Sequence, residues 1–144
     1  QNVYFEAKSE PLAGQYAVAD VVLNRVKDTR YPNTICEVVR EGPIKESWKT
    51  RQHADLAPKE RIYHPIKHRC QFSWYCDGKS DKPKNTKVYN EISELVNYIS
   101  DYDIIDITDG ATHYHADYVS PEWKNTKTKT TEIGDHIFYR WEKK

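Results

Sequence analysis

The chain has 144 residues, of which 38% are hydrophobic and 31% charged, a composition typical of one folded domain with its own apolar core. Lys and Arg number 22 and Asp and Glu also number 22, so no net field favours a nucleic acid or an anionic membrane as partner. No apolar run reaches the roughly 20 residues that span a bilayer, and the first ten residues lack the basic and apolar regions of a signal peptide. Because the chain begins with Gln1 and contains no Met, we expect a fragment or a processed product whose export signal, if it has one, lies upstream.

Two helices are predicted in the first 26 residues. Segment 13–26 is apolar around most of its circumference apart from a polar stripe of Asp20 and Asn24, which predicts a buried central helix. Residues 9–11 (Ser-Glu-Pro) are of the types that interrupt helices. Segment 3–7 is therefore predicted to be a separate short helix.

The middle of the chain is harder to interpret. Residues 35–39 form a short apolar element after a turn at 31–34, whereas 44–69 have no sustained period and are predicted to be a loop with short helical turns. The aromatic run QFSWY, followed by Asp77-Gly78, predicts a strand over 70–76.

The last third contains the clearest patterns. Segment 86–100 is predicted to be an amphipathic helix because apolar residues recur at helical spacing, and 137–141 is predicted to be a strand because apolar residues alternate. The fold class is therefore α+β, mainly helical with a small β-hairpin region.

The three cysteines allow at most one internal disulfide. Cys70 and Cys76 are the plausible pair because they are close in sequence, and Cys36 would stay free. Free thiols at all three positions are the alternative in a reducing compartment.

Glu6 and Glu10 are the first candidate catalytic residues. They are four residues apart and share one face if a helix runs through both. Glu6 lies in a run, Val3–Ala7, that is otherwise without charge, where burial would raise its pKa toward the value that a general acid needs. Two ordinary solvated acids at a helix end fit the same spacing, so the pattern leaves both interpretations open.

His113, His115, Asp117 and His136 are the second candidate set. Residues i and i+2 of a strand share a face, so His113 and His115 can approach one zinc ion, with His136 or Asp117 as third ligand. Such a site would indicate a zinc-dependent cell-wall amidase or peptidase. Histidines bonded to the backbone, or a polar wall facing carbohydrate, explain the same residues.

Aromatic residues are the third feature, with eleven tyrosines and four tryptophans. Their flat faces suit sugar rings and their polar ends suit hydroxyl groups, although half-buried packing uses the same residues. A wall-binding module without catalysis is thus a further alternative. Gly-rich phosphate loops, GxSxG elbows and HExxH helices are absent from the sequence, which removes the commonest nucleotide-binding, serine-hydrolase and metalloprotease interpretations.

Three blocks of sequence, in order, resemble the SleB/CwlJ-type cell-wall hydrolase family. The first is NVYFEAKSEPLAGQYAVADVVLNRV at 2–26, and the second is CQFSWYCDG at 70–78. The third is GATHYHADYVSPEW at 110–123, followed by IGDHIFYR at 133–140. The resemblance covers nearly the whole chain and is weakest over 40–68.

The resemblance implies a lysozyme-like, lytic-transglycosylase-type domain over residues 1–144 that cuts the β-1,4 bond between N-acetylmuramic acid and N-acetylglucosamine. Enzymes of this family act in spore germination, in bacterial wall remodelling and in phage lysis, so the expected place of action is the cell wall, in the periplasm or outside the cell. Glu6 corresponds to the first glutamate of the family motif, and Glu10 is the secondary candidate. Lys8 and Ser9 replace the family's Arg and Gly and leave the catalytic carboxylate intact.

The resemblance also implies a substrate groove. One wall would be formed by the central block and the opposite wall by the third block, with the residues Gln71, Phe72, Ser73 and Trp74 facing Thr112, His113 and Tyr114. One acid is sufficient if the muramic 6-hydroxyl acts as nucleophile, which favours transglycosylation over hydrolysis because no carboxylate pair of a two-acid glycosidase is evident. We expect a monomer that binds peptidoglycan glycan strands and needs neither cofactor nor metal.

Overall fold

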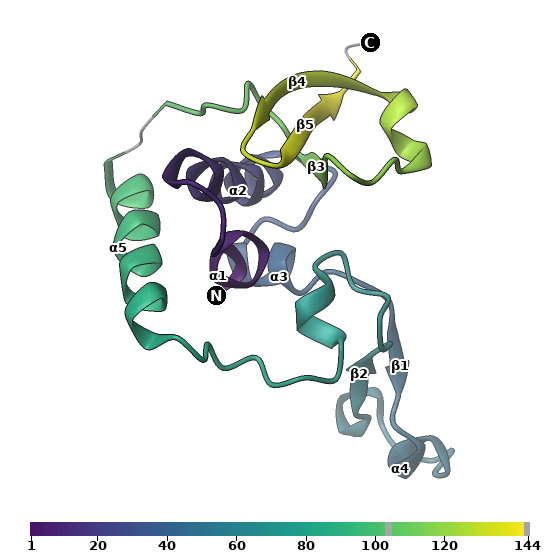
Figure 1. Ribbon diagram of the computed structural model, residues 1–144. Helices are drawn as coiled ribbons and strands as arrows, with labels where there is room; N and C mark the ends of the chain where they lie inside the picture. Colours follow the sequence, from purple (N-terminus) through teal and green to yellow (C-terminus); the bar gives the residue numbers. More distant parts are fainter. Residues whose placement is uncertain (103–104, 143–144) are drawn as a thin grey trace. The chain divides into compact units, whose positions relative to one another are not determined.

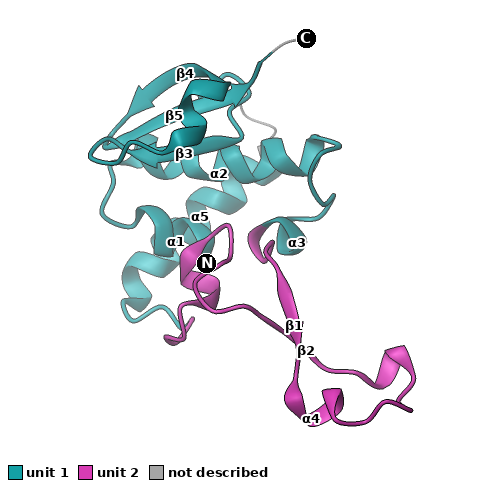
Figure 2. Cartoon of the chain, turned by 90° about the vertical axis from the view of Figure 1, so that its right-hand side faces the viewer, with its two compact units in different colours: residues 1–38, 82–144 teal, residues 39–81 magenta. Residues whose placement is uncertain are grey.

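The computed structural model describes residues 1–102 and 105–142, and the chain divides into two compact units (Figure 2). Unit 1 comprises residues 1–38 and 82–144, and unit 2 comprises residues 39–81. The expectation of one SleB-type domain over 1–144 stays a prediction. The helices and strands are α1 (Asn2–Ala7), α2 (Leu12–Lys27), α3 (Ile35–Val39), β1 (Ile44–Glu46), α4 (Trp48–Arg51), η1 (Pro58–Glu60), β2 (Tyr63–Pro65), η2 (Ser73–Cys76), α5 (Thr86–Tyr102), β3 (His113–Ala116), η3 (Glu122–Thr126), β4 (Lys127–Ile133) and β5 (His136–Trp141).

The core of unit 1 forms around α2, which packs against α1 and α5 (Figure 1). Small and β-branched residues of α2 allow this close approach, and Ala17, Val18 and Val21 are fully buried. Ile92 and Ile99 close the cluster from α5. The helices predicted over 3–7, 13–26 and 86–100 are therefore confirmed.

A three-stranded antiparallel sheet in the order β3-β5-β4 covers another side of α2. The register pairs Tyr114 with Phe138 and His115 with Ile137. Phe138 is fully buried with residues of α2, and Tyr114 packs against the same cluster. We call this face of the sheet the inner face. The strand predicted over 137–141 is confirmed.

Unit 2 differs from its prediction in two places. Segment 44–69, expected to be a loop with helical turns, contains the antiparallel pair β1 and β2 as well as α4. The strand predicted over 70–76 is wrong, because residues 73–76 form the 3-10 helix η2.

The cysteines of unit 2 explain the second difference. Cys70 and Cys76 form a disulfide, with their Cα atoms 6.1 Å apart. Six residues of extended strand would separate the two Cα atoms by roughly 20 Å, so the cross-link requires a compact turn. Cys36 is a free, exposed thiol. Within the two described ranges, no helix combines the length and the apolar character that a membrane crossing requires.

Candidate functional site

Glu6 of α1 points at the inner face of the sheet. The hydroxyl group of Tyr114, on β3, donates a hydrogen bond of 2.9 Å to Glu6 Oε2. The flanking residues Val3, Tyr4 and Ala7 are buried in the core, which fixes the short helix and therefore the direction of the Glu6 side chain.

The surroundings of Glu6 change its acidity. Burial raises the pKa of Glu6 above its ordinary value, and the hydrogen bond from Tyr114 and the positive charge of Arg25 oppose that rise without cancelling it. Burial and the nearby Glu6 raise the pKa of Tyr114 well above its ordinary value, so the phenol stays protonated and remains a donor. The Glu6 carboxyl group therefore holds its proton to a higher pH than an ordinary glutamate does. Once it is ionised, the Tyr114 hydroxyl group can still donate a hydrogen bond to it.

Glu10 has different contacts. Helix α1 ends at Ala7, so the two glutamates do not share a helix face. Glu10 Oε2 accepts a hydrogen bond from the main-chain N–H of Asp135 at 3.2 Å, and Oε1 lies 3.7 Å from His136 Nδ1. Both oxygens thus face the turn between β4 and β5, and Glu10 connects that turn to the segment between α1 and α2.

The predicted set of Thr112, His113 and Tyr114 is divided between two environments. Thr112 is 3% exposed, and its main-chain oxygen accepts a 2.7 Å hydrogen bond from Arg25 Nε. His113 faces away from Tyr114 and packs against Trp123 and Trp141. Burial, with the positive charges of Arg25 and Lys127, lowers the pKa of His113 to about 4, so its ring is neutral at pH 7. Of the three, only Tyr114 contacts Glu6 by a hydrogen bond.

The proposed zinc ligands are also separated by the sheet. His113 and His115 share the outer face, where His115 stacks on Tyr139 and shares a 2.9 Å hydrogen bond with its hydroxyl group. His136 lies on the inner face, with its ring 5.0 Å from that of Tyr114. The three histidines therefore cannot bind one metal ion in this arrangement. Across the described parts of the chain, no group of three His, Cys, Asp or Glu side chains converges on a common point.

The four candidates of the central block lie in unit 2. Phe72 and Trp74 are buried, whereas Gln71 and Ser73 are exposed. Their predicted role as one wall of the Glu6 groove stays a prediction.

Two residues of α2 that were not among the candidates organise the loop before β3. Arg25 is 5% exposed and holds the main chain at Thr112, as described above. Asn24 Nδ2 donates to Asp106 Oδ2 and to the main-chain oxygen of Ala111, both at 2.9 Å. The available signal was the polar pair Asn-Arg near the end of an otherwise apolar helix.

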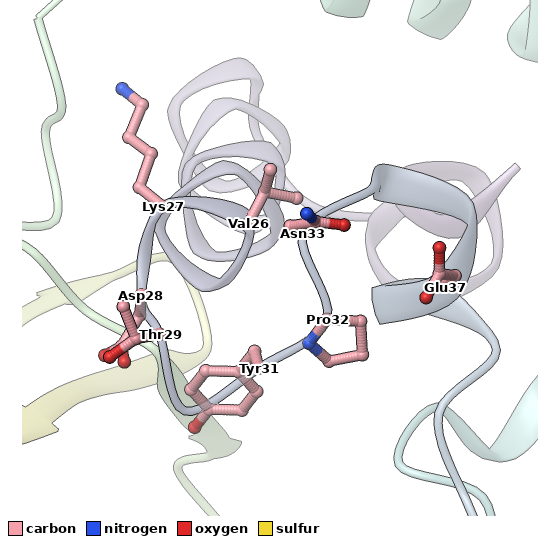
Figure 3. A pocket seen from close by; sticks show the side chains of 8 residues that line it. All are labelled: Val26, Lys27, Asp28, Thr29, Tyr31, Pro32, Asn33 and Glu37. Carbon is pink, nitrogen blue, oxygen red and sulfur yellow. The ribbon is translucent and has the colours of Figure 1, made fainter.

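Two surface cavities of unit 1 lie at the end of α2. The one in Figure 3 has a volume of about 440 Å³ and is lined by Val26, Lys27, Asp28, Thr29, Tyr31, Pro32, Asn33 and Glu37. The other has a volume of about 550 Å³ and is lined by Asp28, Arg30, Gly110, Thr112, Arg140, Trp141 and Glu142. Neither lining includes Glu6 or Tyr114, and Thr112 is the single candidate residue that borders one of them.

With this geometry established, comparison with known proteins identifies the family. The sequence model of the Cell Wall Hydrolase family matches residues 9–139. The chain belongs to the cell wall hydrolase family. The matched segment includes Glu10 and begins after Glu6, so the role of Glu6 depends on its geometry and on the resemblance of the first block.

Individual relatives agree with this assignment. The chain is 51% identical over 39 residues to a spore cortex-lytic enzyme of Bacillus cereus, a match that spans 27% of this chain and 15% of the relative. It is 46% identical over 41 residues to the spore cortex-lytic enzyme of Bacillus subtilis, spanning 28% and 13%. The matches thus cover less than a sixth of the length of these relatives.

Solved structures extend the similarity to the whole fold. The catalytic domain of the Bacillus cereus SleB protein superposes with a TM-score of 0.58 and 26% identity, covering 96% of this chain and 84% of that one. The catalytic domain of the germination-specific lytic transglycosylase SleB from Bacillus anthracis gives a TM-score of 0.55 at 24% identity, covering 96% and 88%. This second likeness concerns the fold alone. The predicted family and the lysozyme-like α+β fold are confirmed.

Proposed function

We propose that this cell wall hydrolase cleaves the glycan strands of peptidoglycan at the β-1,4 bond after N-acetylmuramic acid, with Glu6 as general acid and base. The observation that carries the proposal is the position of Glu6, which is buried enough to raise its pKa and accepts a hydrogen bond from a protonated phenol. A general acid near neutral pH needs this raised pKa.

Glu6 must donate a proton in the first step of cleavage and accept one in the second. Burial favours the protonated form of Glu6, which donates its proton to the glycosidic oxygen. The resulting carboxylate is then stabilised by the Tyr114 hydroxyl group and by the positive charge of Arg25, which both favour the ionised form. The carboxylate next removes a proton from the attacking hydroxyl group.

Three described acids of unit 1 that are at least half-buried bind the backbone, so they are poor candidates for the second carboxylate of an ordinary glycosidase. Glu10 and Asp20 each accept a hydrogen bond from a main-chain N–H group, and Asp106 accepts two, from Thr108 and Gly110. These acids hold the backbone in place. We therefore favour attack by the muramic 6-hydroxyl group, which yields a 1,6-anhydro product, over attack by water.

The substitution Glu6→Gln tests the proposal. It removes the transferable proton but keeps the shape, so we expect release of soluble fragments from purified peptidoglycan to fall by roughly 10²- to 10⁴-fold. Glu94→Gln, at an exposed position of α5, is the matched control and should retain full activity. Full activity of Glu6→Gln would refute the role of Glu6.

Mass spectrometry of the products assigns the reaction. Anhydromuropeptides would indicate transglycosylation, new reducing ends hydrolysis, and released stem peptides an amidase. The last outcome, or the absence of any product, would refute cleavage of the glycan strand.

A further inference from the structure

Residues 44–65 of unit 2, which we call the hairpin tip, fold without an apolar core. The tip comprises β1, α4, η1 and β2, and Lys45 pairs with His64 at the centre of its ladder. All its residues are described, and Thr50, at 8% exposure, is the one that is buried. Because a two-stranded hairpin alone is marginally stable in water, polar interactions must hold the tip together.

Arg61 supplies most of these interactions. Its guanidinium group donates to Glu46 Oε2 at 2.9 Å and to four main-chain oxygens at 3.2 to 3.4 Å, those of Thr50, His53, Ala54 and Leu56. Thr50 Oγ1 also donates to Glu46 Oε2 at 3.0 Å and accepts from the main-chain N–H of Ile62 at 3.3 Å. These bonds join β1, α4 and the segment that leads into β2, so the tip presents its outward side chains from a fixed backbone.

Four large apolar side chains of the tip take no part in this network of side-chain bonds. They are exposed to between 48% and 61%: Ile44, Trp48, Ile62 and Tyr63. Lys49 follows Trp48 in α4, whereas Lys45 alternates with Ile44 and Glu46 along β1 and lies with His64 on the other face of the ladder. The tip carries five Lys or Arg and three Asp or Glu, and Glu46 is already paired with Arg61. Exposed apolar groups rimmed by charge are typical of an interaction surface.

We propose that the hairpin tip is a second peptidoglycan-binding surface, in which Trp48 and Tyr63 stack on sugar rings while Lys49 pairs with a stem-peptide carboxylate. The choice of peptidoglycan as substrate rests on the proposed function, but the surface itself does not depend on Glu6. Peptidoglycan combines apolar ring faces with carboxylates, and the tip combines the exposed rings of Trp48 and Tyr63 with the exposed ammonium group of Lys49. Aromatic rings supply the stacking surface and ammonium groups the complementary charge.

A lipid bilayer is the other partner that basic and aromatic residues suit, and the pattern of the tip disfavours it. A helix or hairpin that lies in a membrane needs a continuous apolar face. On the tip, Glu46 stands between Ile44 and Trp48 in sequence and opposite Tyr63 in the ladder. The charge of Glu46 interrupts the apolar face, but the rings of Trp48 and Tyr63 can still each stack on a different sugar.

Binding to insoluble peptidoglycan tests the proposal apart from catalysis. The full chain carrying Glu6→Gln is sedimented with purified cell-wall sacculi, with and without Trp48→Ala and Lys49→Glu. We expect the added pair of substitutions to weaken binding by roughly tenfold. Tyr118→Ala with Lys87→Glu, at exposed positions of unit 1, is the matched control and should bind like the parent.

Chemical modification of the sacculi checks the charge pairing. Amidation of their carboxylates should weaken binding of the parent and leave the variant nearly unchanged. Equal binding of parent and variant, or retention by phosphatidylglycerol vesicles in place of sacculi, would overturn the proposal. Continued fragment release by Glu6→Gln would instead contradict the proposed function, so the two failures are distinguishable.

Discussion

Asp20, in the middle of α2, offers a quantitative test of how burial controls acidity in this fold. It is 3% exposed and accepts a 3.0 Å hydrogen bond from the main-chain N–H of Ile107. Burial, with the charge and the hydrogen bond of neighbouring Asp106, raises the pKa of Asp20 from 3.8 to about 7. Asp106 stays ionised because hydrogen bonds from Thr108, Asn24 and Gly110 outweigh the effect of its own burial and lower its pKa.

The sign of the effect on stability follows from the direction of the shift. The folded chain binds the proton of Asp20 more tightly than the unfolded chain, so the contribution is fully present below about pH 4 and is lost as the pH rises through about 7. A difference of about three pKa units at 1.36 kcal/mol each gives a ceiling of about 4 kcal/mol above pH 7. Asp20→Asn removes the charge and keeps an oxygen that accepts from Ile107.

Urea unfolding of the wild type and of Asp20→Asn at pH values from 4 to 8 measures this difference. We expect the two free energies of unfolding to be similar near pH 4, and the variant to become more stable than the wild type as the pH rises. Groups common to both proteins cancel in the comparison, and Asp55→Asn, at an exposed position, is the control. A difference that is constant with pH, or largest at low pH, would refute the reasoning.

Two further predictions concern the contacts of the glutamates. Tyr114→Phe removes a hydrogen bond that favours the carboxylate of Glu6, so the pKa of Glu6 should rise further and the basic limb of the pH–rate profile should move to higher pH. An unmoved limb, measured by fragment release from peptidoglycan, would contradict this. Glu10→Ala should cost about 0.5 to 1.5 kcal/mol in unfolding free energy, since it removes the hydrogen bond that the exposed N–H of Asp135 donates. Activity of its folded fraction should persist, and a loss as deep as that of Glu6→Gln would count against the structural role of Glu10.

The parts of the fold that were predictable from sequence are those whose buried faces leave a periodic pattern of apolar residues. Helix α2 and helix α5 show it clearly, as does the alternation along β5. The hairpin tip was not predictable because it depends on one side chain, Arg61, which collects acceptors from five different residues. Hydrogen bonds that converge on one side chain produce no periodic pattern in the sequence. The turn 70–76 was mistaken for a strand because aromatic β-propensity is weaker than a cross-link that closes six residues.

The candidate site was predictable in part, for a related reason. The shared face of His113 and His115 followed from strand geometry, but the position of His136 depends on the register between β3 and β5. That register pairs His136 with Ala116, and strand alternation then puts its ring beside Tyr114. Pairing register is a property of the assembled sheet, which the local pattern around each histidine does not contain.

Because α1 ends at Ala7, Glu6 and Glu10 contact different parts of the sheet. If the helix continued, Glu6 and Glu10 would lie one above the other and repel. Because it stops, the two side chains separate along the inner face of the sheet, where Glu6 meets Tyr114 of β3 and Glu10 meets His136 of β5.

The two partner rings are themselves in contact, with centroids 5.0 Å apart, so the sheet places both carboxyl groups along one continuous row of side chains. Glu10 anchors the β4–β5 turn and thereby helps to keep β5 beside β3, the strand that carries the hydrogen-bond donor of Glu6. Both glutamates therefore contact the same sheet, and of the two only Glu6 accepts the hydrogen bond from Tyr114.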